Sequence, residues 1–514
     1  MANTLTEYLI DLYEDDSPIE PNFLAETDEQ QYATYLYEHY LKKDHNYKFI
    51  DIDGQNRKSL RYDEITDHVI KSNAVVTINN VCWIYDKESG FFRPNKNDIE
   101  KSILNIFEES EYSQKHTVRH AIQDIMCRII AKTTLIENPF NYDLDRVMVK
   151  NGVLNLVTET LTPSSPAYGF TRRLNVTYDP TADDTFIRNY LSDIVATDRD
   201  IALLTQIGAH AITQMQIKKL YICYNKSGNN GKSTFLSFIR EFLGTNNVSS
   251  ITLQDLEKDK FRVANIEGKL ANIQPDLPKG TIVSDSTIKV ATGGDTMTIE
   301  PKYQQAYDYL NSAPFIFGCN EIPTIKTSSN AFYNRVYLIE FPNQFTVDPK
   351  FNELLFTEEN KSAYLNLALE AVRKLKTEGP IAQDESVTRE QWSQLSDNAY
   401  RFIKNHMAID NESIDPIPFK NLHYAYTQFC IKNGEIVMGQ NKFKSALVSL
   451  GYRIKNKGPK GEQIAYVMNA KMLSEEYRRM LMEIDDTFDD ILITRSSQYS
   501  RNHDAACQVN QSHE

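Results

Sequence analysis

The chain has 514 residues, a formal net charge of −14, 41% hydrophobic residues and 25% charged residues. This length accommodates two to four domains, and the composition is typical of globular proteins. The negative balance argues against a surface covered with nucleic acid, although a local basic channel is compatible with it. Because no segment resembles a signal peptide or a membrane span, we expect a cytoplasmic protein without membrane contact.

The first 190 residues are predicted to form an acidic helical segment, residues 1–72, followed by an α+β domain, residues 73–190. Tyrosines at helical spacing in residues 32–40 favour a packed core or interface over a base-stacking surface. Later elements are two hairpins, one at Asn79-Asn80 and one around Asn151-Gly152, and helices over residues 98–107 and 118–130. No pair of aspartates with the pattern of a two-metal primase site stands out in this part.

The chain is organised around the segment that follows the Leu- and Ile-rich helices of residues 184–213. Residues 219–224 predict a buried strand, residues 225–231 a tight turn, and Lys232 opens an apolar-periodic helix. Such a turn directs backbone N–H groups at anionic oxygens in front of a helix. Lys232 would reach the β- and γ-phosphates of ATP and Ser233 would bind Mg²⁺. The predicted nucleotide-binding residues are Ser227, Gly228, Asn229, Asn230, Gly231, Lys232, Ser233 and Thr234.

One departure from the usual phosphate loop is Lys226, which stands where a glycine is expected. The neighbouring Gly228 supplies backbone freedom instead.

Three polar residues beyond the loop lie at the ends of predicted strands. Asp276 follows the apolar run at 270–273 and could hold the water shell of Mg²⁺ or polarise the attacking water, although Pro275 replaces the usual first acid of a pair. Asn320 ends a second buried strand and could orient water against a γ-phosphate. Arg335 opens a third strand and could reach the nucleotide of a neighbouring subunit.

In their order and spacing these motifs resemble those of the superfamily 3 helicases, and within them the phage, plasmid and mobile-element replication proteins related to poxvirus-type primase-helicases. The resemblance covers residues from about 75 to 470 and is most specific in the stretches 225–233, 292–295 and 317–320. Pathogenicity-island replication initiators look like the nearest kind of relative.

The resemblance implies an α/β, AAA+-like P-loop NTPase core over residues 191–380. Within it, Lys232 and Ser233 would form the first nucleotide motif, Asp276 the second, Asn320 the sensor and Arg335 the finger that acts on the next subunit. It also implies that Lys289 and the hairpin around Lys302 project toward a central pore and follow single-stranded DNA.

The C-terminal quarter begins with a polar linker and is predicted to form a winged-helix domain, residues 381–480. Helices over residues 419–432 and 441–450 precede a glycine-tipped basic turn and a strand at 464–468, and in such a fold the second helix and the wing can contact DNA. Residues 481–514 are predicted to be an acidic, disordered tail. The predicted DNA-binding residues here are Lys442, Lys444, Arg453, Lys455, Lys457 and Lys460.

The leading interpretation is an ATP- and Mg²⁺-dependent replicative DNA helicase that forms a ring, expected to be a hexamer, on single-stranded and forked DNA. Its further candidate partners are origin duplex DNA and a separate primase. The alternative is a sequence-specific origin-binding initiator in which ATP acts mainly as an assembly switch. A DNA-packaging or protein-remodelling ATPase is disfavoured by Thr292-Gly293-Gly294-Asp295 and the hairpin that follows it.

Overall fold

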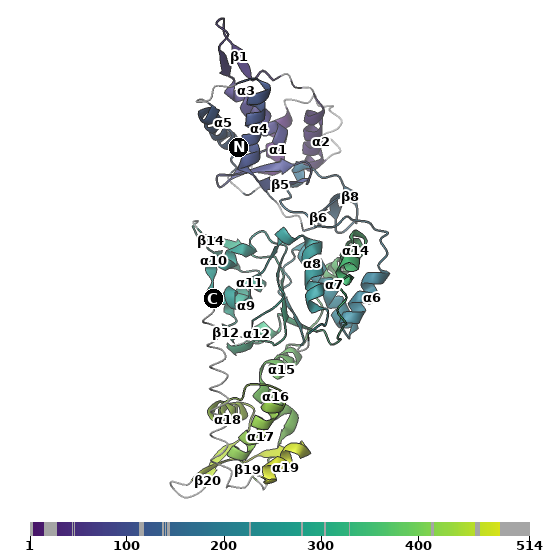
Figure 1. The fold of residues 1–514 in the computed structure, drawn as a ribbon, viewed down its shortest axis with the longest axis vertical. Helices are drawn as coiled ribbons and strands as arrows, with labels where there is room; N and C mark the ends of the chain where they lie inside the picture. Colours follow the sequence, from purple (N-terminus) through teal and green to yellow (C-terminus); the bar gives the residue numbers. More distant parts are fainter. Residues whose placement is uncertain are drawn as a thin grey trace. The chain divides into compact units, whose positions relative to one another are not determined.

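The structure is a computed structural model. It describes residues 4–14, 28–43, 45, 47–112, 118–135, 138, 140, 144–225, 228–278, 281–302, 305–327, 329–412, 416–457 and 463–483. The chain divides into two compact units: the first comprises Met1–Asn320 and Ile325–Gln383, and the second Glu321–Thr324 and Asp384–Glu514. Figure 1 labels their elements.

The first unit begins with a helical part that packs on a small antiparallel sheet. The tyrosines of α2 lie in its core: Tyr32, Tyr37 and Tyr40 are buried beside α1, as the sequence predicted. At the predicted hairpin, Asn79 and Asn80 both have positive φ, which suits a two-residue turn between paired strands. The elements are α1 (Leu5–Tyr13), α2 (Glu29–Lys42), β1 (Ile50–Ile52), β2 (Lys58–Leu60), α3 (Tyr62–Asn73), β3 (Val76–Ile78), β4 (Val81–Asp86), β5 (Phe91–Pro94), α4 (Lys96–Glu109) and α5 (Val118–Thr133).

A second antiparallel sheet, β6 (Arg146–Val149), β7 (Gly152–Asn155) and β8 (Leu161–Thr162), follows in the same unit. Val149 pairs with Gly152, so the predicted hairpin is present. A short 3₁₀ helix, η2 (Pro166–Tyr168), comes next.

The centre of the first unit is a five-stranded parallel sheet in the order β10 (Val248–Ser249), β11 (Ala271–Gln274), β15 (Phe315–Cys319), β9 (Leu220–Tyr224) and β17 (Val336–Glu340). The residues of β15 are all buried, as expected for a parallel strand that is covered on both faces. Figure 1 shows α6 (Thr185–Ile194), α7 (Asp198–Thr213), α8 (Lys232–Leu243) and α14 (Glu358–Glu378) together on one side of the central strands. These four helices share one hydrophobic core with the sheet. The first unit is therefore a mixed α/β fold built on a parallel sheet.

The remaining elements of this part are short. Figure 1 shows α9, α10 and α11 on the other side of the strands, whereas α13 packs through Phe351 against Tyr190 of α6. These remaining elements are η3 (Thr245–Asn247), α9 (Leu253–Lys258), α10 (Lys260–Val263), η4 (Ala264–Ile266), β12 (Thr281–Ser284), α11 (Ser286–Gly293), β13 (Thr296–Ile299), β14 (Tyr307–Leu310), β16 (Thr324–Thr327), α12 (Asn330–Tyr333) and α13 (Phe351–Leu355).

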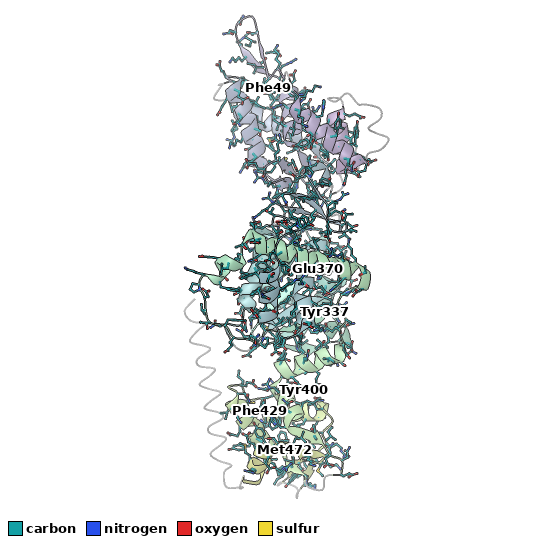
Figure 2. All side chains as sticks on the ribbon, turned by 90° about the vertical axis from the view of Figure 1, so that its right-hand side faces the viewer. Phe49, Tyr337, Glu370, Tyr400, Phe429 and Met472 are labelled. Carbon is teal, nitrogen blue, oxygen red and sulfur yellow. The ribbon has the colours of Figure 1, made fainter. Side chains whose placement is uncertain are left out.

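The second unit has its own core, in which the rings of Tyr426 and Phe443 stack with centroids 4.4 Å apart. Phe429 and Met472, labelled in Figure 2, belong to the same core. The predicted helices are present as α17 (Phe419–Lys432) and α18 (Gln440–Ser449). The other elements are α15 (Glu385–Ser396), α16 (Asn398–His406), β18 (Met407–Ile409), β19 (Ile417–Pro418), β20 (Ile454–Lys457), β21 (Ile464–Val467), β22 (Ala470–Met472) and α19 (Glu475–Glu483).

The predicted tail overlaps the end of α19 at residues 481–483, and its remainder lies outside the described residues. Among the residues that the structure describes, no helix is both long enough and apolar enough to cross a bilayer.

Candidate functional site

The turn between β9 and α8 is formed as the sequence predicted in the part that is described. Asn229 and Gly231 have φ values of 55° and 80°, and Gly231 directly precedes the first residue of α8. A β-carbon on Gly231 would stand 2.9 Å from Ile194 Cγ2, so the turn packs closely against α6. Ser227 and Lys226, which belong to the predicted loop, lie outside the described residues.

Lys232 is a buried cation at the carboxyl end of β9. Only 4% of the residue is exposed, and its Nζ donates to Cys319 O and Asn320 Oδ1, both at 2.8 Å. Burial lowers the pKa of Lys232, although nearby groups, including Asp276, oppose this shift. In the described part of the chain no carboxylate lies within ion-pair distance of this ammonium. The site therefore holds a positive charge that an anionic ligand would neutralise.

The order of the strands brings Asn320 to Lys232. Because β15 lies between β9 and β11, the residue after β15 stands beside Lys232, and the end of β11 lies on the other side of β15. Leu277 N donates to Gly318 O at 2.8 Å, so the chain after β11 stays against β15. A β-carbon on Gly318 would lie 2.2 Å from Pro275 O, so this close approach needs glycine.

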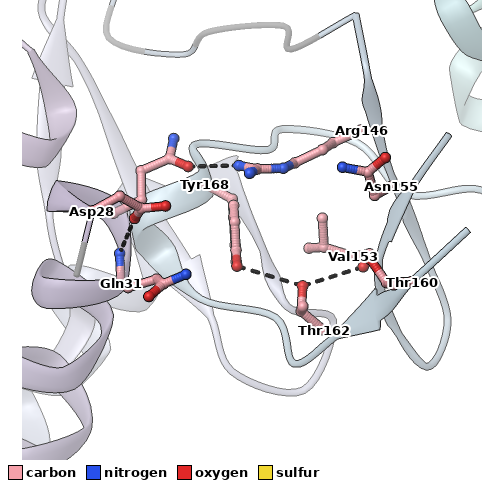
Figure 3. A pocket seen from close by; sticks show the side chains of 9 residues that line it. Asp28, Gln31, Arg146, Val153, Asn155, Thr160, Thr162 and Tyr168 are labelled. Carbon is pink, nitrogen blue, oxygen red and sulfur yellow. Dashed lines mark hydrogen bonds between the residues drawn. The ribbon is translucent and has the colours of Figure 1, made fainter. Parts of the chain in front are cut away.

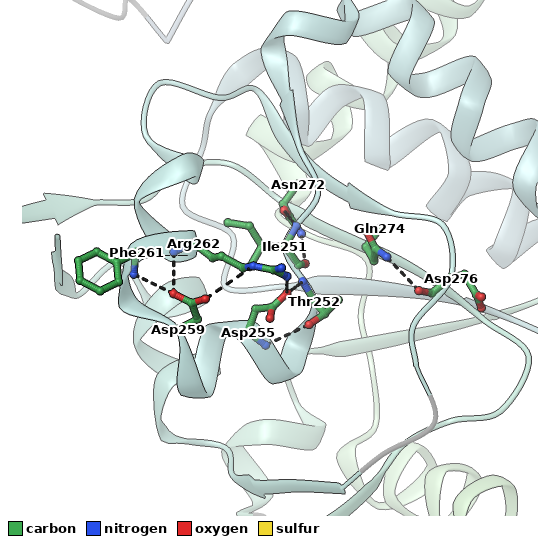
Figure 4. Close-up of polar contacts among 9 residues, drawn as sticks. All are labelled: Ile251, Thr252, Asp255, Asp259, Phe261, Arg262, Asn272, Gln274 and Asp276. Carbon is green, nitrogen blue, oxygen red and sulfur yellow. Dashed lines mark hydrogen bonds and ion pairs between the residues drawn. The ribbon is translucent and has the colours of Figure 1, made fainter. Parts of the chain in front are cut away.

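Asp276 is exposed two residues beyond β11, and Gln274 Nε2 donates to its backbone carbonyl at 3.0 Å (Figure 4). Ser233 is exposed on the first turn of α8, where Thr234 is half-buried. A hydroxyl and a carboxylate are oxygen ligands of the kind that Mg²⁺ prefers, so these residues fit the predicted metal role chemically. In the described residues no three or more His, Cys, Asp or Glu side chains are grouped as a metal site.

Arg335 lies at the amino ends of the parallel strands, opposite Lys232. It directly precedes β17, which runs parallel to β9, so it stands at the amino end of these strands, whereas Lys232 follows their carboxyl end. Its Nη1 donates to Ala331 O at 2.7 Å, and its buried Nε has no hydrogen-bond partner in the described structure. The structure therefore keeps Arg335 apart from Lys232 of its own chain.

Two further cations, which the sequence analysis did not single out, lie beside Arg335. Lys219 directly precedes β9 just as Arg335 precedes β17, and the register Leu220↔Val336 aligns the two positions. Burial, and then the charges of Arg199 and Arg335, lower the pKa of Lys219 to about 8. The Lys219 ammonium and the Arg199 guanidinium both lie over the Tyr337 ring, which Figure 2 labels, at 4.8 and 5.8 Å from its centroid. Only the pairing of β9 with β17 could have revealed this cluster.

The two residues expected to follow DNA occupy different settings. Lys302 is exposed beyond β13 in the hairpin formed by β13 and β14, whose last described pair is Ile299↔Tyr307. Lys289 lies on α11, and its Nζ stands 3.0 Å from Asp285 Oδ1. The hairpin is thus confirmed, whereas Lys289 makes an intramolecular ion pair that the sequence did not predict.

In the second unit, the predicted basic residues come from α18 and β20. Lys442, Lys455 and Lys457 are exposed, and Lys444 is half-buried. Lys455 and Lys457 are two positions apart on β20 and so project from one face of the hairpin with β21. Arg453 donates to Asn411 Oδ1 at 2.9 Å, and Lys460 lies outside the described residues.

A small polar pocket of about 90 Å³ lies elsewhere in the first unit, between α2 and the β6–β8 sheet (Figure 3). Arg146 Nη1 donates to Gln30 Oε1 at 2.6 Å, and the guanidinium lies over the Tyr168 ring. Polar side chains that line this pocket form hydrogen bonds with one another, and none of the predicted site residues lines the pocket.

Comparison with known proteins adds family information. Residues 33–196 match a domain described as D5 N terminal like, and residues 223–335 match DUF5906, a family of unknown function. A Sputnik virophage protein named "Putative helicase V13" is 22% identical over 402 residues, which cover 69% of this chain and 51% of that protein. An Invertebrate iridescent virus 3 protein named "Putative helicase 121R" is 23% identical over 246 residues, covering 45% and 26%. The chain therefore contains a region similar to the D5 N terminal like domain and is similar to viral proteins named putative helicases.

The match to DUF5906 covers the described part of the candidate site in one continuous stretch. It begins in β9 and ends at Arg335, so it contains Lys232, Asp276 and Asn320. The chain spans about half the length, or less, of these curated relatives. A solved structure titled "The A form apo structure of NrS-1 C terminal region-CTR" aligns over 77% of this chain and 95% of that chain, with a TM-score of 0.41 and 12% identity.

Proposed function

We propose that this chain is an ATP-dependent DNA helicase motor of the superfamily 3, AAA+-like type that works as a ring on single-stranded DNA. The observation that carries the proposal is Lys232, a buried ammonium held by Asn320 at the carboxyl end of a parallel sheet with Asp276 nearby. ATP phosphates would replace the protein acceptors of this ammonium, and the backbone N–H groups before α8 would bind the remaining phosphate oxygens.

In this proposal the exposed Ser233 hydroxyl and Asp276 carboxylate would hold Mg²⁺, which would supply positive charge against the phosphates when bound. Asn320 is released from Lys232 once phosphate occupies the ammonium, and its amide then orients the attacking water. Asp276 accepts a hydrogen bond from the same water. The pairing of β15 with β11 and β9 supports these roles, because Lys232, Asn320 and Asp276 follow the carboxyl ends of three neighbouring strands.

The position of Arg335 supports a site that is shared between subunits. Arg335 and Lys232 lie beyond opposite ends of neighbouring five-residue strands, which span about 17 Å at 3.3 Å per residue. A guanidinium at that distance cannot reach the phosphates of its own chain. In a ring, however, the cluster of Arg199, Lys219 and Arg335 would face the nucleotide of the next subunit and stabilise the charge of the transition state. A hexamer remains the expected assembly.

The exposed hairpin with Lys302 would then contact the backbone of single-stranded DNA and move it when the nucleotide state changes. In the second unit, Lys455 and Lys457 would contact phosphates of duplex DNA as the wing of a winged-helix domain. A separate primase stays a predicted partner.

The test compares Lys232→Ala with a matched exposed lysine on the same unit, Lys258→Ala. We expect Lys232→Ala to lower ATP hydrolysis and forked-DNA unwinding by about 10² fold or more, because the phosphates lose their buried cation. Lys258→Ala should keep both rates. A Lys232→Ala protein that hydrolyses ATP at the wild-type rate would refute the proposed nucleotide site.

Mixing two inactive variants tests the shared site. Lys232→Ala and Arg335→Ala are each expected to be inactive alone. In mixed rings, however, an Arg335→Ala subunit offers an intact phosphate loop to the intact Arg335 of a Lys232→Ala neighbour, so ATP hydrolysis should partly return. If Arg335→Ala alone hydrolyses ATP at the wild-type rate, the finger role is wrong.

The second candidate function is an origin-binding initiator in which ATP mainly controls assembly. The exposed lysines of β20, in a chain of net charge −14, are the observation that favours it. Footprinting of origin DNA with the full chain and with residues 1–383 separates the two. Loss of origin protection with retained unwinding would make the second unit a targeting module on a motor.

A further inference from the structure

Helix α11 lies between the hairpin that carries Lys302 and the segment that carries Arg335. At its C-terminal end the chain turns through Gly294, with φ of 79°, into β13. The same helix packs against α12, which ends two residues before Arg335. Any displacement of α11 would therefore act on both the hairpin and Arg335.

The first connection is Asp285, the residue before α11. Only 6% of Asp285 is exposed, and its Oδ2 accepts the N–H and the hydroxyl of Ser329 at 2.9 and 3.0 Å. Ser329 is the residue that precedes α12. Burial opposes ionisation, but the hydrogen bonds from Ser329 and Lys289 outweigh it and hold the pKa of Asp285 below its usual value. A buried carboxylate with these partners is costly to separate from them.

The partner on the other oxygen of Asp285 is Lys289, the residue expected to contact DNA. Its Nζ lies 3.0 Å from Oδ1 and 3.3 Å from Ser329 Oγ, while about a third of its side chain remains exposed. A phosphate that approached this ammonium from solvent would compete directly with Asp285 for it.

The second connection is at the opposite end of α11. A β-carbon on Gly293 would stand 3.6 Å from Arg335 Nη2, so the guanidinium lies close to the last turn of the helix. Nη1 of the same guanidinium donates to Ala331 O on α12. Arg335 is thus positioned by α11 and α12 together, and Asp285 joins these two helices.

Building on the proposed function, we propose that Asp285 is a positioning residue that couples the binding of single-stranded DNA at Lys289 to the placement of Arg335 against the neighbouring nucleotide. When a DNA phosphate takes the ammonium of Lys289, the carboxylate keeps only Ser329. The loss of Lys289 changes how the carboxylate binds Ser329 at the start of α12. We expect α12 to shift as a result and to move Arg335 with it. DNA held by one subunit would in this way change the hydrolysis rate in the next.

The test measures ATP hydrolysis by the full-length protein with and without saturating single-stranded DNA. Asp285→Asn removes the charge but keeps the shape. Ser329→Ala removes the hydroxyl bond to Asp285 and keeps the backbone N–H bond and the ion pair, so it weakens the connection to α12. In the wild-type protein the ratio of the rate with DNA to the rate without it should lie at about 5 to 150, the usual range for coupled sites. We expect this ratio to fall toward one in both variants, because the link between Lys289 and α12 is weakened. DNA affinity should not weaken in Asp285→Asn, because Lys289 becomes free for phosphate.

The matched control is Asp86→Asn, since Asp86 is also largely buried, accepts from the Ser89 hydroxyl and pairs with Arg93 at 3.1 Å. It should keep the wild-type ratio. A merely structural role of Asp285 would lower both rates in proportion and leave their ratio intact, and this outcome would overturn the proposal. A wild-type protein without any ATP hydrolysis would instead overturn the proposed function itself.

Discussion

Gly318 offers the sharpest test of how the candidate site is assembled. Its substitution by alanine would put a β-carbon 2.2 Å from Pro275 O and 2.9 Å from Leu236 Cδ1. The first distance is 1.2 Å less than the 3.4 Å at which ordinary contact begins, and the atom it meets is backbone. The strands that carry Asn320 and Asp276 must therefore move apart.

We expect Gly318→Ala to destabilise the first unit by about 3 kcal/mol, the upper end for overpacking of a core. The entropic gain of alanine over glycine in the unfolded chain, about 0.4–1 kcal/mol, offsets only part of this cost. A misplacement of about 1 Å among catalytic groups can reduce the rate by about 10²-fold, so ATP hydrolysis should fall with stability.

The assay is thermal unfolding together with ATP hydrolysis at a temperature where both proteins are folded. Gly54→Ala is the control, because a β-carbon there meets no atom within 4 Å and its backbone is not left-handed. It should leave the unfolding temperature nearly unchanged, whereas Gly318→Ala should lower it by about 3 °C. Equal unfolding temperatures and equal rates for the two variants would show that β11 and β15 do not approach as described.

Three other predictions follow from the structure. Because the native pKa of Lys219 is about 8, below its ordinary value of 10.5, the unfolded chain binds the extra proton between these pH values. The free energy of unfolding should therefore rise from pH 8 to 10, and Lys219→Met should flatten this rise in calorimetry. Replacing Lys455 or Lys457 by alanine should weaken duplex binding similarly for all sequences and reduce the salt slope by about one each. Residues 384–483, which have their own core, should fold alone with a cooperative transition in circular dichroism, and a non-cooperative transition would contradict this.

The sequence alone was sufficient to predict the turns and helices that depend on neighbouring residues. The turn before Lys232, the Asn79-Asn80 hairpin and helix α17 all formed where turn residues and apolar spacing predicted them. These features involve residues close together in the chain, and their backbone preferences act over a few positions. The same local pattern sufficed to predict that Asp276 and Asn320 follow buried strands.

Only the tertiary structure decided which of these residues meet. Buried parallel strands are all similar apolar runs, so their order cannot be read from local pattern. The order β11, β15, β9 and β17 places Asn320 against Lys232 and aligns Lys219 with Arg335 at the far edge of the sheet. Likewise, the sequence marked Lys289 as a DNA ligand, but its partner Asp285 and the bond from Asp285 to Ser329, 44 residues away, arise from packing between distant segments. Such contacts depend on the whole fold because they join groups that no short stretch of the chain contains.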